Sequence, residues 1–133
     1  MNKYFIIFEP SIKPTELITV PFSDKLEDLQ SLVDGHIEHL TFEGLNDHYI
    51  DCWINEEGKL KGMKPSLAYT HAGQIVDIVV GPLVFTRYDD FGETYGLTDL
   101  DLNTIAQWIN DKPLMSCTDS DTGVTWLIPE IEI

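Results

Sequence analysis

Hydrophobic residues recur along this chain at two spacings, one typical of strands and the other typical of helices. The continuous apolar run at residues 4–8 predicts a strand buried on both faces, and residues 17–20 predict its hairpin partner. Residues 48–54 alternate, with Ile50 and Cys52 on one face of the strand and Trp53 on the other. Similar runs predict further strands at residues 36–42, 74–80, 83–88, 114–117 and 124–128.

A first amphipathic helix is predicted over residues 24–34. Its leucines recur every three residues and therefore fall on one face. Asp24, followed three residues later by Glu27, is typical of a capping box, with Ser23 as the competing cap. The Asp-Gly pair at residues 34–35 predicts the end of the helix, because glycine readily adopts the backbone conformation found there.

A second amphipathic helix is predicted over residues 98–111. Thr98 is expected to cap it together with Asp101, the third helical residue, while Leu97 is placed to contact Leu102 across the cap. The apolar stripe of this helix continues at helical spacing through Leu102, Ile105, Ala106 and Ile109.

These elements predict a single α+β domain over residues 1–133, in which a mainly antiparallel sheet packs against two amphipathic helices. Residues 65–71 are expected to form a short helical turn. The Gly-Pro pair at residues 81–82 predicts a sharp bend between two strands. Residues 113–133 are expected to form a C-terminal hairpin that extends the domain.

Several segments of the chain together resemble an uncharacterised protein family. They are LQSLVDGHIE at residues 29–38, NEEGKLKG at residues 55–62, DIVVG at residues 77–81, a turn at Gly92, and Leu-Thr-Asp at residues 97–99. In this order they resemble the domain-of-unknown-function family 3846, which is found in phages, plasmids and conjugative elements. The resemblance covers about residues 4–110 and implies one compact domain in a mobile-element context, with no established reaction.

The chain departs from the family pattern at two positions. Asp34 stands where glycine is frequent, and Ser66 stands where asparagine is frequent. Neither departure removes a known function, because none is established for the family.

The acidic charge is the most unusual property of the composition. Eight basic residues stand against 23 acidic ones, which gives a formal net charge of −15. Residues 1–88 carry 13 acids and seven bases, a net of −6, whereas residues 89–133 carry ten acids and one base, a net of −9. Such a surface repels phosphates, so direct nucleic-acid binding is not expected, with Lys59, Lys61 and Lys64 as a local exception.

Two interpretations of this charge are open. It forms either a solvated surface that promotes solubility or a face that binds a basic protein. Because B-DNA carries one charge per ~1.7 Å, 15 charges correspond to about 26 Å of duplex, and a chain of this length has a radius of gyration of about 14 Å. The charge is therefore sufficient to imitate a short duplex, provided that it lies mostly on one side.

We expect a non-enzymatic accessory protein that binds a basic host protein through an acidic face. The carboxylates expected on this face are Asp89, Asp90, Glu93, Asp99 and Asp101. They would guide association electrostatically, and a nucleic-acid-binding protein such as a defence nuclease is the expected class of partner. That class rests on analogy with the mobile-element context that the resemblance implies.

Trp53 is the aromatic candidate for contact with a partner, unless a helix covers it. One alternative function is a structural component that self-associates through the face of Trp53. The other is a small enzyme, which would need a pocket around His48, Asp51 or His71.

The sequence predicts no metal site, cofactor or membrane span. His36 and His39 lie three positions apart on a predicted strand, which places their rings on opposite faces. Cys52 and Cys117 form no Cys-x-x-Cys motif and are expected to be reduced, partly buried thiols. No apolar run approaches the roughly 18 residues of a membrane span, and no export signal is recognised, so a cytoplasmic location is expected.

Overall fold

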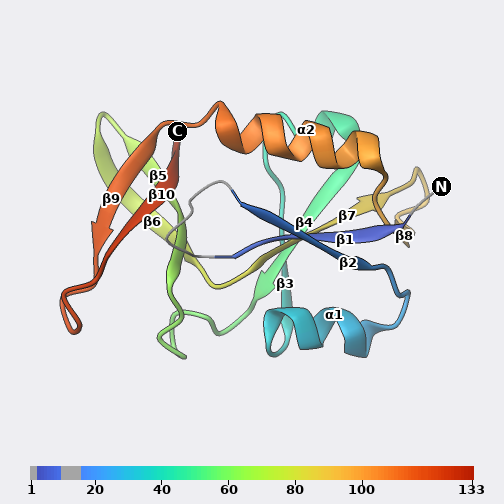
Figure 1. Ribbon diagram of the computed structural model, residues 1–133, viewed down its shortest axis with the longest axis horizontal. Helices are drawn as coiled ribbons and strands as arrows, with labels where there is room; N and C mark the ends of the chain where they lie inside the picture. The colour runs from blue at the N-terminus through green and yellow to red at the C-terminus, as the bar shows by residue number, and fades with distance from the viewer. Residues whose placement is uncertain (1–2, 10–15) are drawn as a thin grey trace.

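Two β-sheets and two α-helices make up the part of the chain that the computed structural model describes, residues 3–9 and 16–133 (Figure 1). This arrangement confirms the expected α+β class with mainly antiparallel sheets. In chain order the elements are β1 (Tyr4–Phe8), β2 (Leu17–Pro21), α1 (Leu26–Val33), β3 (Ile37–Leu40), the 3₁₀ turn η1 (Asn46–His48), β4 (Ile50–Asn55), β5 (Pro65–His71), β6 (Gln74–Val80), β7 (Leu83–Tyr88), β8 (Thr94–Tyr95), α2 (Asp99–Asn110), β9 (Leu114–Thr118) and β10 (Thr125–Glu132).

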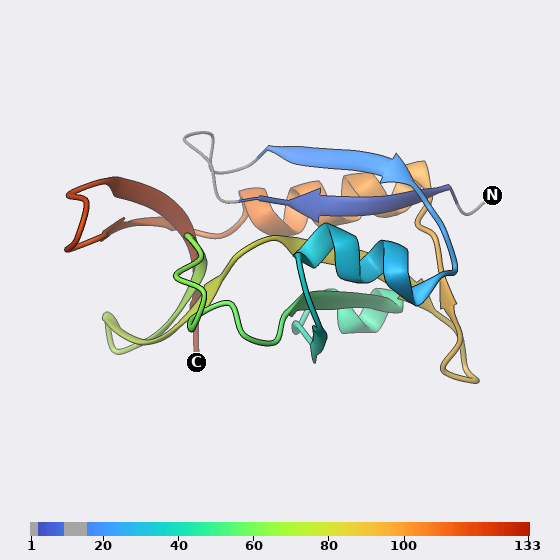
Figure 2. The same cartoon turned by 90° about the horizontal axis from the view of Figure 1, so that it is seen from below.

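The first sheet is antiparallel and lies between the two helices. Its strand order is β2-β1-β7-β4-β3, and β8 pairs with the end of β7. α1 and α2 lie on opposite faces of this sheet (Figures 1 and 2). The prediction that β1 is buried on both faces is confirmed, because Ile6 packs in one cluster with Ile105 of α2, while Phe5 packs in another with Leu29 of α1.

The second sheet has the order β6-β5-β10-β9 and contains the single parallel pair of the described residues, β5 with β10. The predicted C-terminal hairpin is confirmed as β9 and β10. β10 continues beyond the expected strand and pairs with the middle of the chain, with Glu130 opposite Ala68. The bend at residues 81–82 separates β6 in the second sheet from β7 in the first, with Gly81 at a φ of 81°.

The helical turn predicted at residues 65–71 is wrong, because these residues form strand β5. Their backbone groups pair with β6 on one side and with β10 on the other. β10 lies about 60 residues further along the chain, since Glu130 pairs with Ala68. This long-range pairing overrides the weak local preference of the segment.

The capping box predicted at the start of the first helix is also wrong. α1 begins at Leu26, and its N-cap residue Lys25 makes no side-chain capping bond. The hydroxyl of Ser23 instead accepts a hydrogen bond from the backbone amide of Lys25 and donates one to Asp28. The strands expected at residues 36–42 and 48–54 are confirmed with altered ends, because residues 46–48 form η1.

The end of α1 is held by a side chain from β4. Asp34, the C-cap residue, has a left-handed backbone with φ 61°. The buried Asn55 donates hydrogen bonds of 2.9 Å to the carbonyl oxygens of Val33 and Asp34 and accepts one from the backbone amide of Glu57. A Cβ atom on Gly35 would lie 2.7 Å from Asn55 Nδ2, so a larger residue there would displace this contact.

Candidate protein-docking surface

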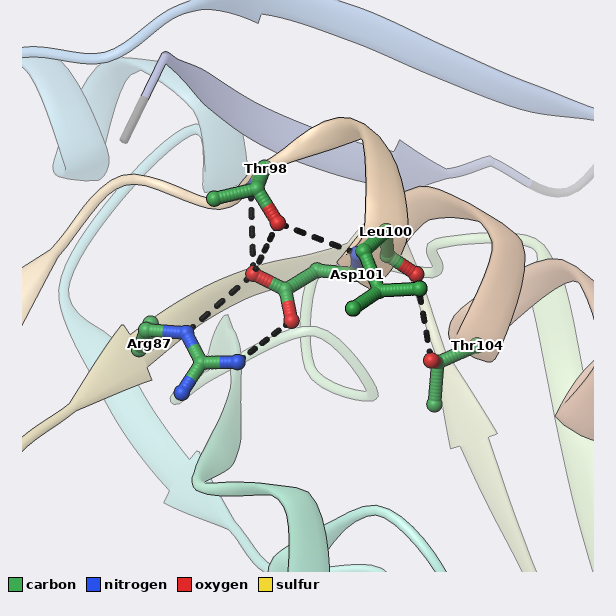
Figure 3. A network of polar contacts seen from close by, with 5 residues as sticks. All are labelled: Arg87, Thr98, Leu100, Asp101 and Thr104. Atoms are coloured by element: carbon green, nitrogen blue, oxygen red, sulfur yellow. Dashed lines mark hydrogen bonds and ion pairs between the residues drawn. The ribbon is translucent and has the colours of Figure 1, made fainter. Parts of the chain in front are cut away.

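Asp101, expected on the acidic face, is instead a buried residue in the first turn of α2. Its carboxylate accepts hydrogen bonds from the backbone amide and the hydroxyl of Thr98, at 2.9 and 3.1 Å (Figure 3). The guanidinium of Arg87 donates to both carboxylate oxygens. The predicted capping box is therefore confirmed, while the expected place of Asp101 on an exposed face is wrong, because its carboxylate is fully engaged inside the protein.

The Arg87 pair keeps the Asp101 carboxylate charged. Burial alone would raise the pKa of Asp101, but the hydrogen bonds from Arg87 and Thr98 outweigh it and lower the pKa below its usual value. The same hydrogen bond raises the pKa of Arg87. Each charge of the pair thus neutralises the other at the base of α2.

Asp89 fixes the turn between β7 and β8. Its side chain accepts hydrogen bonds from the backbone amides of Phe91 and Glu93, each 2.9 Å, and from the hydroxyl of Tyr95, also 2.9 Å. Desolvation acts to raise the pKa of Asp89, but these hydrogen bonds outweigh it, and the pKa is lowered. The turn predicted at residues 89–92 is confirmed, and the carboxylate of its first residue, Asp89, holds it in place.

Exposed aromatic side chains surround this turn. Phe91 at its tip is 90% exposed, and Tyr95 of β8 and Tyr49 after η1 are also exposed. Tyr49 lies against Tyr88, with ring centroids 5.4 Å apart, and Tyr88 donates its hydroxyl hydrogen to Asn46. Tyr49 and Tyr95 line a shallow hollow with Asp89 and Asp90.

We call this region the turn surface and define it by Tyr49, Asp90, Phe91, Glu93 and Tyr95. Asp90 and Glu93 are exposed, and no ion pair links either of them to another described residue. Asp99 is exposed at the start of α2, where its carboxylate lies 3.4 Å from Lys3 Nζ. Three of the five expected carboxylates, those of Asp90, Glu93 and Asp99, therefore face solvent without a buried partner.

Trp53 does not project from an open face, because it packs against the apolar cluster beneath α1. Its indole N–H donates a 2.8 Å hydrogen bond to the hydroxyl of Thr86. The imidazole of His39 covers it from β3, with ring centroids 5.0 Å apart. The expected contact of Trp53 with a partner from an open face is thus wrong, because this half-buried side chain packs with Leu29 and Val33 of α1. Self-association of the protein stays a prediction.

A histidine–aspartate pair on the same sheet face was missed by the sequence reasoning. His39 Nε2 lies 2.7 Å from Asp51 Oδ1. The pairing of β3 with β4, in which His39 faces Trp53, brings the two together. The alternation of residues along β4 predicts that Asp51 and Trp53 lie on the same face. That His39 lies beside them follows only from the pairing of β3 with β4, which the sequence did not show. The hydroxyl of Thr86, the residue paired with Asp51 across β4 and β7, accepts the hydrogen bond from Trp53.

The other candidate residues lie apart. Among residues 3–9 and 16–133, no three histidine, cysteine, aspartate or glutamate side chains form a group that could hold a metal ion. Cys52 and Cys117 are free thiols, and burial raises the pKa of Cys52 well above its usual value. None of the helices described has both the length and the apolar character that a membrane crossing requires.

Comparison with known proteins gives a family and no close relative. No curated protein and no solved structure shows significant similarity to the chain. The family model described as "Domain of unknown function (DUF3846)" matches residues 1–110, which is most of the chain. The match includes the turn surface, Arg87 and Asp101, and it ends before the hairpin of β9 and β10. The protein belongs to the DUF3846 family.

Proposed function

We propose that this protein is a non-enzymatic accessory protein that binds a basic partner protein through the turn surface. The observation that carries the proposal is Phe91, which is 90% exposed at the tip of a turn that Asp89 holds by three hydrogen bonds. A large aromatic side chain on an ordered turn loses little conformational freedom on binding, which is typical of residues that dominate protein interfaces.

The charges beside Phe91 favour a basic partner. Asp90 and Glu93 flank it, and Asp99 lies at the nearby start of α2. The single arginine of the chain, Arg87, does not offset them, because its charge is paired with Asp101. Carboxylates around an aromatic anchor speed the encounter with a positively charged surface and oppose binding to an acidic one.

The proposed class of partner is a nucleic-acid-binding protein of the host cytoplasm. Its basic groove would be covered by this acidic chain, which would then act as an inhibitor, for example of a defence nuclease. Support comes from the net charge of −15 and from the mobile-element context that the family resemblance implied.

A comparative capture experiment tests the proposal. The wild-type protein and a turn variant, Asp90→Asn with Phe91→Ala and Glu93→Gln, are immobilised, incubated with host lysate and eluted by a salt gradient. A matched control variant carries Glu56→Gln, Glu57→Gln and Leu60→Ala, which removes two exposed carboxylates and one exposed apolar side chain elsewhere. Mass spectrometry then identifies the proteins that each bait retains.

We expect the wild type and the control variant to retain a common basic protein that the turn variant loses. Retention of the same proteins by all three baits would contradict the proposal, as would loss from the control variant alone. Circular dichroism of the three proteins checks that the substitutions leave the fold intact.

A further inference from the structure

A large groove lies at the C-terminal end of α2. The turn surface lies near the other end of this helix, which has 12 residues and is therefore about 18 Å long. The walls of the groove are residues 41–44 after β3, residues 111–113 after α2, and the end of β10 at residues 130–133. The groove measures about 740 Å³, within the range of roughly 300–1,000 Å³ found for ligand sites.

The floor of the groove is aromatic and fixed in place. Phe42 and Trp108 are buried, with ring centroids 5.0 Å apart, and Tyr69 and Ile131 are half-buried beside them. The indole N–H of Trp108 donates a 3.1 Å hydrogen bond to the carbonyl oxygen of Glu43. The half-buried Tyr69 and Ile131 therefore offer apolar area, supported by a fixed aromatic base, that needs no rearrangement before a ligand binds.

The rim of the groove is acidic. It carries four carboxylates, those of Glu43, Asp111, Glu130 and Glu132, against one ammonium group, that of Lys112, a net of −3. Lys112 Nζ lies 4.8 Å from the centroid of the Trp108 ring, a cation–π contact. The groove thus already holds one cation of the chain itself and keeps an excess of negative charge.

One wall is an open strand edge. In β10 the amide of Glu130 donates to Pro113, on the side of β9, and the amide of Ile133 donates to Thr70, on the side of β5. Because successive backbone groups of a strand alternate in direction, the N–H and C=O of Glu132 point away from β5. β9 begins only at Leu114, which pairs with Pro129, so no strand of the described residues continues beside Glu132.

We propose that this groove binds an extended, lysine- or arginine-rich segment of a partner protein, which adds as a strand to the open edge of β10. Alternate side chains of an added strand face opposite directions. Apolar residues of the segment would lie on the floor, over the half-buried Tyr69 and Ile131 and the exposed edge of Trp108, and basic residues would meet the carboxylates of the rim. The proposal concerns a surface separate from the turn surface and does not depend on it.

The probe is a fluorescein-labelled peptide of alternating lysine and valine, eight residues long by design, with alternating glutamate and valine as its acidic counterpart. Binding is measured by anisotropy at low ionic strength and located by nuclear magnetic resonance. Of the three tryptophan indole signals, that of Trp108 should shift and that of Trp53 should not. The acidic peptide should not bind.

Substitutions in the rim should act in opposite directions. Glu43→Gln with Asp111→Asn and Glu132→Gln should weaken binding about tenfold, whereas the same loss of charge in Glu56→Gln with Glu57→Gln and Asp121→Asn should change it less than about twofold. Lys112→Gln should strengthen binding about threefold, because it removes a competing cation from Trp108. Lys64→Gln is its matched control, since Lys64 lies over Trp126 outside the groove, 5.0 Å from that ring.

Backbone methylation tests the strand addition. Two peptides are N-methylated, one on every lysine and the other on every valine, which blocks hydrogen bonding along one edge at a time. One isomer should lose binding while the other retains it. Equal binding of both isomers and of the parent peptide, an unmoved Trp108 signal, or equal effects of the rim and control variants would overturn the proposal. The turn variant should bind the peptide like the wild type, so the two proposals fail independently.

Discussion

The guanidinium of Arg87 in β7 and the carboxylate of Asp101 in α2 are joined by two hydrogen bonds, and the same carboxylate caps its own helix through Thr98. One side chain therefore fixes where α2 begins and anchors that point to the central strand of the first sheet. The turn that carries Asp90 and Phe91 begins at Asp89, two residues after Arg87, so this pair also helps to set the position of the proposed docking site.

Removal of the Asp101 charge should destabilise the fold. Asp101→Asn leaves the buried side of Arg87 without its partner and weakens the cap, so the free energy of unfolding should fall by about 2–3 kcal/mol. Urea denaturation measures this change. The neighbouring Asp99→Asn, whose pair with Lys3 is exposed, should cost about 0.5 kcal/mol or less, and equal losses for both would contradict the structural role of Asp101.

Asp101 should also determine how steeply the free energy of unfolding falls at low pH. The pKa of Asp101 is lower in the folded protein than its usual value, so the unfolded state binds the proton first as the pH falls. Its stabilising contribution is complete above pH of about 4 and is lost below that value. Wild-type stability should therefore fall more steeply below pH of about 4 than that of Asp101→Asn, and parallel curves would exclude this linkage.

Asn55 should be essential for the end of α1. Asn55→Ala removes two hydrogen bonds to the last helical carbonyls and one from Glu57, which should lower the free energy of unfolding by about 2–3 kcal/mol. Asn103→Ala, at an exposed position of α2, is the control and should change it by about 0.5 kcal/mol or less. Chemical denaturation of both variants decides whether Asn55 acts as the cap.

Glycine should be better than aspartate at position 34. Asp34 has φ 61°, a conformation that glycine adopts without steric cost, so Asp34→Gly should stabilise the protein by about 0.5–1 kcal/mol. The bond from Lys61 Nζ to position 34 goes to the backbone carbonyl and survives the change. Ser31→Gly, inside α1, should have the opposite sign, and a loss of stability in both variants would refute the account of the helix end.

The two thiols should differ in reactivity. Cys52 is 1% exposed, and burial raises its pKa, whereas Cys117 is only half-buried. Because the thiolate is the reactive form, iodoacetamide should modify Cys117 first and spare Cys52 until urea unfolds the protein. Mass spectrometry of partly alkylated protein would show the order, and early modification of Cys52 would mean that its strand opens readily.

Local patterns were sufficient to predict most of the elements. The cap of Thr98 and Asp101 and the alternation around Cys52 involve residues close in sequence, whose geometry is fixed by helix and strand periods. β5 could not be predicted in the same way, because its stability depends on β10, about 60 residues away. The division into two sheets follows from that pairing and was likewise outside the reach of local reasoning.

The candidate site was only partly predictable for a related reason. The sequence identified Asp89, Asp90 and Glu93 as one acidic turn, but it could not show that Asp89 serves the turn itself while its neighbours remain exposed. Neither could it show that Arg87 pairs with Asp101 across two elements. Whether a carboxylate is exposed or hydrogen-bonded inside the protein depends on its neighbours in the tertiary structure, and a count of charges along the sequence does not show them.

The most direct test of the docking site is the rate at which the protein associates with its captured partner, measured over a series of salt concentrations. The wild type and the control variant with Glu56→Gln, Glu57→Gln and Leu60→Ala should associate rapidly at low salt and more slowly as salt rises. The turn variant, Asp90→Asn with Phe91→Ala and Glu93→Gln, should associate about tenfold more slowly at low salt and depend less on salt. Identical rates for all three proteins at every salt concentration would show that the turn surface is not where the partner binds.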